Sequence, residues 1–131
     1  MYQGVIIEES LKNKDVLKNL KFIDTKVEPV TPKHKTPWLT QWTLHTVEVP
    51  EDKIRQLAEA ISHSLDRDFW YADFRNANTH YIIFLNKVFK VDLNQPEQYK
   101  PVVDYGLSLG VPDYQLDFAP TIKQWKRPEP A

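Results

Sequence analysis

The first half of the chain follows the two-residue period of β-strands. Gln3–Ile7 is a short run that is apolar on both sides, which predicts a strand in the middle of a sheet. Lys21–Pro29 alternates between apolar and charged positions and predicts a half-buried strand with one solvated face. Thr40–Val49 alternates in the same way and ends at Pro50, so it is the predicted partner of that strand.

Helical periodicity is clearest in Glu51–Leu65. Acidic residues open this segment, where they stabilise the positive end of a helix dipole. One apolar stripe runs along it and predicts the face that packs on the sheet: Ile54, Leu57, Ala58, Ile61 and Leu65. Asn13–Leu20 predicts a short helix that needs packing to form. A capping pattern at Asn94 predicts another helix, which stops near Gly106.

The second half contains three segments rich in aromatic and β-branched residues. Phe69–Phe74, His80–Leu85 and Val88–Asp92 are separated by short polar turns, which predicts an antiparallel meander. A further helical turn is predicted from Pro112. Ala119–Ala131 has three prolines and little apolar periodicity, so it is expected to be an extended tail.

The order of these elements predicts an α+β fold. Strand, helix, strand, strand, helix, strand is the order of a ferredoxin-like split βαβ sandwich, here extended by a β-meander and a C-terminal helix. The helices are expected mainly on one face of an antiparallel sheet, and another arrangement of that class is the alternative. No internal repeat or linker divides the chain, so residues 1–118 are expected to form one domain and residues 119–131 the tail.

Composition narrows the classes of protein. The chain has 131 residues and a net charge of -1, in the range of globular domains. Residues 10–38 hold seven Lys/Arg against three Asp/Glu, whereas residues 92–118 hold one against five. Because the net charge of the chain is close to zero, a dedicated nucleic-acid-binding protein is not expected. Four Trp, six Tyr and six Phe must fill the core or a recognition surface.

Several chemistries lack the residues they require. There is no cysteine, so disulfides, thiolate metal sites and cysteine nucleophiles are excluded. The three glycines form no Walker, GxGxxG or GxSxG motif, and no cofactor is expected. Because no segment has the pattern of a secretory signal or of a membrane span, the expected location is the cytoplasm, with no membrane partner.

The most unusual local composition surrounds Pro37–Trp42. Trp38 and Trp42 are four residues apart and follow a basic stretch of Lys33, His34 and Lys35. Tryptophans and cations in this pattern could stack a planar ligand or a base while the cations contact a phosphate. The alternative is that both tryptophans cap the core and the basic residues solvate a loop.

A second candidate site centres on Asp73, a charged residue within a segment that is otherwise apolar. In a strand, Tyr71 and Asp73 project to one face. If His45 or His80 lies beside Asp73, the carboxylate and imidazole could act as an acid–base pair with Tyr71 as a hydrogen-bond donor. We therefore predict that Asp73 comes within hydrogen-bond or one-water reach of His45 or His80. The alternative is a solvated Asp73 at a strand end.

Metal binding is not expected. Consecutive acids at Glu8 and Glu9 could supply oxygen ligands, although beginning a helix needs fewer assumptions. The four histidines, His34, His45, His63 and His80, show no paired-ligand spacing.

Three segments, HKTPWLTQWTLHTVEVPED, FWYADF and YIIFLNKVFKVD, resemble short conserved prokaryotic proteins that have no assigned activity. The resemblance covers most of residues 1–118. It implies a bacterial or archaeal origin and carries no catalytic residues.

Three hypotheses of function follow. The leading one is a small domain that binds a ligand or a protein through an aromatic-rich surface and forms a homodimer. The second is a small enzyme that uses His45, Tyr71, Asp73 and His80. The third is binding of single-stranded nucleic acid by Trp38, Trp42 and the nearby lysines.

Overall fold

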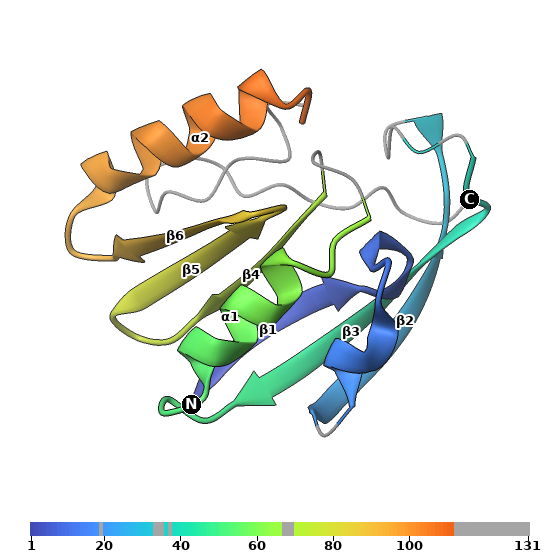
Figure 1. The fold of residues 1–131 in the computed structure, drawn as a ribbon, viewed down its shortest axis with the longest axis horizontal. Coiled ribbons are helices and arrows are strands. Elements are labelled where there is room, and N and C mark those ends of the chain that lie inside the picture. The colour runs from blue at the N-terminus through green and yellow to red at the C-terminus, as the bar shows by residue number, and fades with distance from the viewer. Residues whose placement is uncertain (19, 33–35, 37, 67–69, 112–131) are drawn as a thin grey trace.

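The computed structural model describes residues 1–18, 20–32, 36, 38–66 and 70–111, which form an antiparallel sheet and two α-helices (Figure 1). The strands are β1 (Tyr2–Ile7), β2 (Lys21–Pro29), β3 (Gln41–Val49), β4 (Tyr71–Arg75), β5 (Thr79–Phe84) and β6 (Lys87–Asp92). The helices are α1 (Ile54–Ser62) and α2 (Tyr99–Ser108). Short 3-10 turns are η1 (Glu8–Ser10), η2 (Lys14–Leu17) and η4 (Pro96–Gln98).

The sheet has the order β2-β3-β1-β4-β5-β6, which confirms the central position expected for the first strand. β1 pairs antiparallel with β3 on one side and with β4 on the other. Gly4 permits the close approach of β4, because a Cβ atom there would overlap the carbonyl oxygen of Asp73 and the ring of Phe74. The meander β4-β5-β6 is also confirmed.

Helix α1 lies on one face of the sheet, as the apolar stripe predicts. Ile54, Ala58 and Ile61 are fully buried and share a cluster with Tyr81 and Ile83 of β5. The helix is shorter than the predicted Glu51–Leu65, because residues 51–53 form a turn before it. Burial fixes the helix by one side and leaves its other side exposed.

Helix α2 lies on the opposite face, so the expectation of helices mainly on one face is wrong. Tyr99 and Val102 of α2 pack with Ile82 and Phe84, the residues of β5 that alternate with those facing α1. β5 is apolar on both sides, and each side needs a cover. The sequence signal for this arrangement was the run of apolar residues in β5, which places apolar side chains on both faces of the sheet.

The ferredoxin-like topology is not confirmed. A split βαβ unit joins two parallel strands through a helix and leaves a third strand between them. β3 and β4 flank β1 in this way and are joined through α1, whereas β1 and β2 flank β3 but are joined by the 3-10 turns η1 and η2 instead of a helix. The helix predicted over Asn13–Leu20 is wrong as well. Only the 3-10 turn η2 forms there, and the side chain of Asn13 accepts a hydrogen bond from the Asp15 N–H at its start.

Strand β2 pairs with β3 as predicted, but its burial differs from the prediction. Ile23 and Val27, on the side expected to be covered, are 46% and 52% exposed. Glu28, on the side expected to be solvated, is 1% exposed. A bulge between Phe22 and Asp24 shifts the register of the strand, and β2 lies at the edge of the sheet, where few elements cover it.

The remaining predictions concern the end of the chain and the membrane. The turn predicted from Pro112 and the tail Ala119–Ala131 lie outside the described residues. Among the residues that are described, neither helix combines the length and apolar character needed to span a bilayer.

Candidate functional site

Three polar side chains form a hydrogen-bonded chain on the α2 face of the sheet, and we call them the His80 cluster: Asp73, His80 and Tyr99. Nε2 of His80 lies 2.7 Å from Oδ2 of Asp73. Nδ1 of His80 lies 2.8 Å from the hydroxyl oxygen of Tyr99. Asp73 pairs directly with Ile82, so Asp73 and His80 are diagonal neighbours on one face, and Tyr99 reaches them from the start of α2.

The three side chains of the His80 cluster differ in their exposure to solvent. His80 is 1% and Tyr99 2% exposed, whereas the Asp73 side chain is 35% exposed. Desolvation raises the pKa of the Tyr99 hydroxyl above its ordinary value of 10.0; nearby Arg75 lowers this pKa and Asp73 adds to the rise. A carboxylate only accepts hydrogen bonds, so the contact between His80 and Asp73 is donated by Nε2–H of the imidazole.

The His80 cluster confirms the prediction that Asp73 lies within hydrogen-bond reach of a histidine. It differs from the four residues expected to act together. Tyr71 packs its ring at 5.8 Å from that of Phe84, and Tyr99 is the tyrosine that bonds to His80. A catalytic role for these residues stays a prediction.

His45 belongs to a separate cluster, which we call the His45 cluster: Glu8, Thr25 and His45. Its Nε2 lies 3.0 Å from Oε1 of Glu8, and its Nδ1 lies 2.9 Å from the Thr25 hydroxyl oxygen. The ring of Phe22 stacks on the imidazole at 4.6 Å. His45 pairs with Ile6 in the sheet and therefore lies on the face opposite His80. The two histidines cannot serve one site.

Glu9, the other acid considered as an oxygen ligand for a metal, holds β3. Its carboxylate accepts hydrogen bonds from the Thr43 N–H at 2.6 Å and the Thr43 hydroxyl at 2.8 Å. No group of three potential metal ligands occurs among the described side chains. The acids after β1 thus connect η1 to β3.

The two tryptophans of the Pro37–Trp42 segment have different environments. Trp42 is 2% exposed, packs against Trp70 at 5.3 Å and donates a hydrogen bond from its ring N–H to the Thr36 hydroxyl. Trp38 is 47% exposed. The structure therefore does not bring the pair together as a stacking surface, and the basic residues expected beside them, Lys33, His34 and Lys35, lie outside the described residues.

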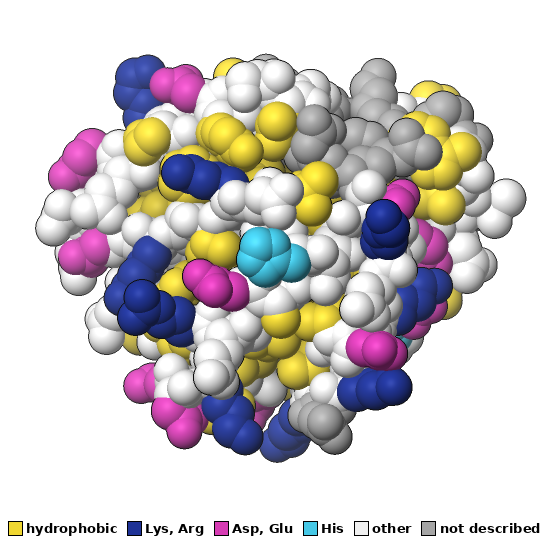
Figure 2. All heavy atoms as spheres, viewed as in Figure 1, with side chains coloured by type: hydrophobic (Ala, Val, Ile, Leu, Met, Phe, Trp, Pro, Cys, Tyr) yellow, Lys and Arg dark blue, Asp and Glu magenta, His cyan; other side chains and the backbone are white. Residues whose placement is uncertain are grey.

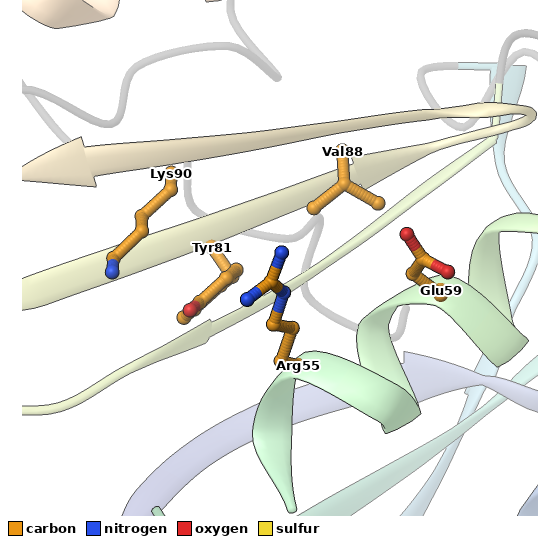
Figure 3. Close-up of a pocket in the computed structure, with 5 residues that line it drawn as sticks. All are labelled: Arg55, Glu59, Tyr81, Val88 and Lys90. Atoms are coloured by element: carbon orange, nitrogen blue, oxygen red, sulfur yellow. The ribbon is translucent and has the colours of Figure 1, made fainter.

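A hollow opens on the other face, between α1 and the hairpin of β5 and β6 (Figure 3). Its volume is about 390 Å³, and its lining residues are Arg55, Glu59, Tyr81, Val88 and Lys90. Lys90 Nζ lies 5.9 Å from the centre of the Tyr81 ring. The hollow therefore combines two cations, one carboxylate, one aromatic ring and one aliphatic side chain.

The hollow's residues were not among those selected from the sequence. Arg55 and Glu59 look like ordinary solvent-facing positions of an amphipathic helix, and Lys90 like the polar position of an alternating strand. Their spacing of four residues on α1 was the available signal, since it places both on one side of the helix. The strand residues opposite them depend on how α1 docks.

Comparison of the chain with protein-family models, with curated proteins and with solved structures gives no match. The resemblance to short prokaryotic proteins stays a proposal. The surface that carries α1 shows acidic and basic side chains side by side, without one field of a single sign (Figure 2).

Proposed function

We propose that this protein is a small binding domain that holds a small organic anion in the hollow between α1 and the β5-β6 hairpin. The observation that supports this most is the placement of Arg55 and Lys90 around Tyr81. In the part of the chain that the structure describes, neither cation forms an ion pair. Both are therefore available to a ligand.

The charges favour an anionic ligand. Two cations and one carboxylate give the hollow a net positive charge. An arginine guanidinium presents paired N–H groups that match a carboxylate or a phosphate, and a lysine adds a second charge-assisted hydrogen bond. Glu59 favours a ligand that also carries a hydroxyl or amino group to donate to it.

The apolar lining favours a ligand with a carbon skeleton. Tyr81 is 7% exposed and Val88 half-buried, so they form the inner part of the hollow. A volume of about 390 Å³ falls in the range of small-molecule sites. α1 is fixed to the sheet by fully buried side chains, which places the backbone of Arg55 and Glu59 at the rim of the hollow without a ligand.

Thermal unfolding with a panel of small organic anions tests this proposal. A ligand present at about ten times its dissociation constant stabilises the fold by about 1.4 kcal/mol, which raises Tm by about 4 °C. We expect Arg55→Ala and Lys90→Ala to abolish that shift. Lys53→Ala, which removes an exposed cation just before α1, is the matched control and keeps it. Equal shifts in all four proteins, or no shift with any anion at 10 mM, would reject the proposal.

A second candidate function is acid–base catalysis at the His80 cluster. It is supported by the continuous hydrogen-bonded chain from Asp73 through His80 to Tyr99. Because the other two groups are buried, Asp73 is the group that would exchange a proton with a substrate. Hydrolysis of p-nitrophenyl acetate and p-nitrophenyl phosphate is a direct test. We expect a rate above background that Asp73→Asn removes, and background rates for both proteins would count against catalysis of these two classes.

A further inference from the structure

Strand β2 exposes apolar side chains at one edge of the sheet. Phe22, Ile23 and Val27 are 44%, 46% and 52% exposed, and residues 21–27 are all exposed. Within the described sheet β2 has one neighbour, β3 (Figure 1). A nine-residue edge strand with exposed apolar residues is a template for pairing with another strand.

The sequence of β2 is complementary to itself when two copies run antiparallel. If Thr25 faces Thr25 of a second copy, Asp24 faces Lys26 and Lys26 faces Asp24. In the same register Ile23 faces Val27 on both sides of the axis. Opposite charges and apolar side chains placed directly across an antiparallel ladder stabilise it. We propose that the protein forms a homodimer through β2, with a two-fold axis at Thr25.

The neighbouring registers are less favourable. In a dimer whose two-fold axis is perpendicular to the sheet, directly opposed residues of the two β2 strands lie on the same face. The axis must therefore pass through one residue of β2, and each alternative register places it at a different residue. An axis at Asp24 places that carboxylate opposite itself, and an axis at Lys26 places two ammonium groups together. An axis at Val27 places Lys26 opposite Glu28, which is buried. It also brings Pro29, which lacks an N–H, into the ladder. The charges of β2, together with Pro29 and the burial of Glu28, therefore favour the axis at Thr25.

The bulge in β2 limits the length of this contact. It lies between Phe22 and Asp24 and interrupts regular pairing there. Regular ladder pairing is thus limited to residues 24–26, with the side chains of Ile23 and Val27 in contact at its two ends, and the dimer should dissociate on dilution. Basic and acidic side chains lie side by side along the edge of the molecule that carries β2 (Figure 2), as a self-complementary edge requires.

This interface is independent of the proposed ligand site. β2 and the β5-β6 hairpin are at opposite edges of the sheet. Two copies joined at β2 would leave both hollows accessible. Of the aromatic residues, Trp42 and Phe84 cannot make the dimer contact, because these side chains are 2% and 0% exposed.

Charge reversal tests the register directly. Sedimentation equilibrium of the unmodified chain at 10–500 μM should show a mass rising from 15.4 kDa toward twice that value. Asp24→Lys places lysines opposite each other, and Lys26→Glu places acids opposite each other, so each variant should bind itself at least tenfold more weakly. Lys12→Glu, an exposed reversal outside β2, is the control and should leave dimerisation unchanged.

Mixing the two variants separates pairing from misfolding. Asp24→Lys and Lys26→Glu chains, each monomeric alone, should form a heterodimer, because every opposed pair then has opposite charges. Far-UV circular dichroism establishes that each variant is folded. A monomeric unmodified chain at 500 μM, dimers that ignore both reversals, or variants that do not associate when mixed would each overturn the β2 dimer.

Discussion

The hydroxyl of Tyr99 makes the most specific prediction about stability. Tyr99→Phe removes the hydrogen bond to Nδ1 of His80 but keeps the ring that packs in the α2 cluster. Both partners are almost fully buried, so losing this bond should cost about 1–3 kcal/mol at pH 7. For a domain of this size, 2 kcal/mol lowers Tm by about 7 °C.

The same substitution has a defined pH dependence. Burial raises the pKa of Tyr99 in the folded state, whereas the unfolded chain loses this proton near pH 10. The stabilisation is therefore complete below pH 10 and falls as the pH rises toward the folded pKa, by about 1.4 kcal/mol for each unit. The difference between the unmodified chain and Tyr99→Phe should shrink above pH 10.

Urea unfolding followed by tryptophan fluorescence at pH 7, 9, 10 and 11 measures this difference. Tyr105→Phe is the matched control, since Tyr105 lies on the same helix, and its ring contacts are those with Phe84 and Phe89. That control should change stability by less than about 0.5 kcal/mol. A loss below 0.5 kcal/mol in Tyr99→Phe, or a loss that stays constant to pH 11, would refute the assigned hydrogen bond and the desolvation of the hydroxyl.

Three further substitutions test the packing, each read from urea unfolding. Gly4→Ala places a methyl group against β4 and should cost more than about 2 kcal/mol; a neutral result would contradict the close approach of the strands. Ile61→Asp buries a charge under α1 and should unfold the domain, while exposed Gln56→Ala should change little. Glu9→Ala removes both acceptors of Thr43 and should cost about 1–3 kcal/mol, with stability equal to the unmodified chain arguing against the link between η1 and β3.

Local pattern was sufficient to predict most elements of the fold. The stripe on α1 and the alternation of β3 report burial directly, because the period of the chain decides which side chains share a face. Sheet order was not accessible in this way. The side chains of β5 are apolar on both faces, and the choice of face for α2 depends on contacts far apart in sequence.

The candidate site was predictable only in part. Asp73 is conspicuous because it interrupts an apolar segment, and His80 lies on the next strand at hairpin distance. Tyr99 was missed, since it reads as an ordinary core position of a helix whose docking the sequence does not specify. β2 was misjudged because alternation identifies a strand face without showing whether anything covers it.

The two faces of β5 divide the described interior into compartments of unequal size. Sixteen buried hydrophobic residues of the described chain belong to the cluster that includes the buried side of α1, and six belong to the cluster around α2. The smaller compartment has less apolar area to hold it closed, so α2 can detach in a partial opening while the larger core stays intact. Amide hydrogens of α2 should then exchange with solvent well before those of β5, and the His80 cluster would meet water in that open state without loss of the fold around α1.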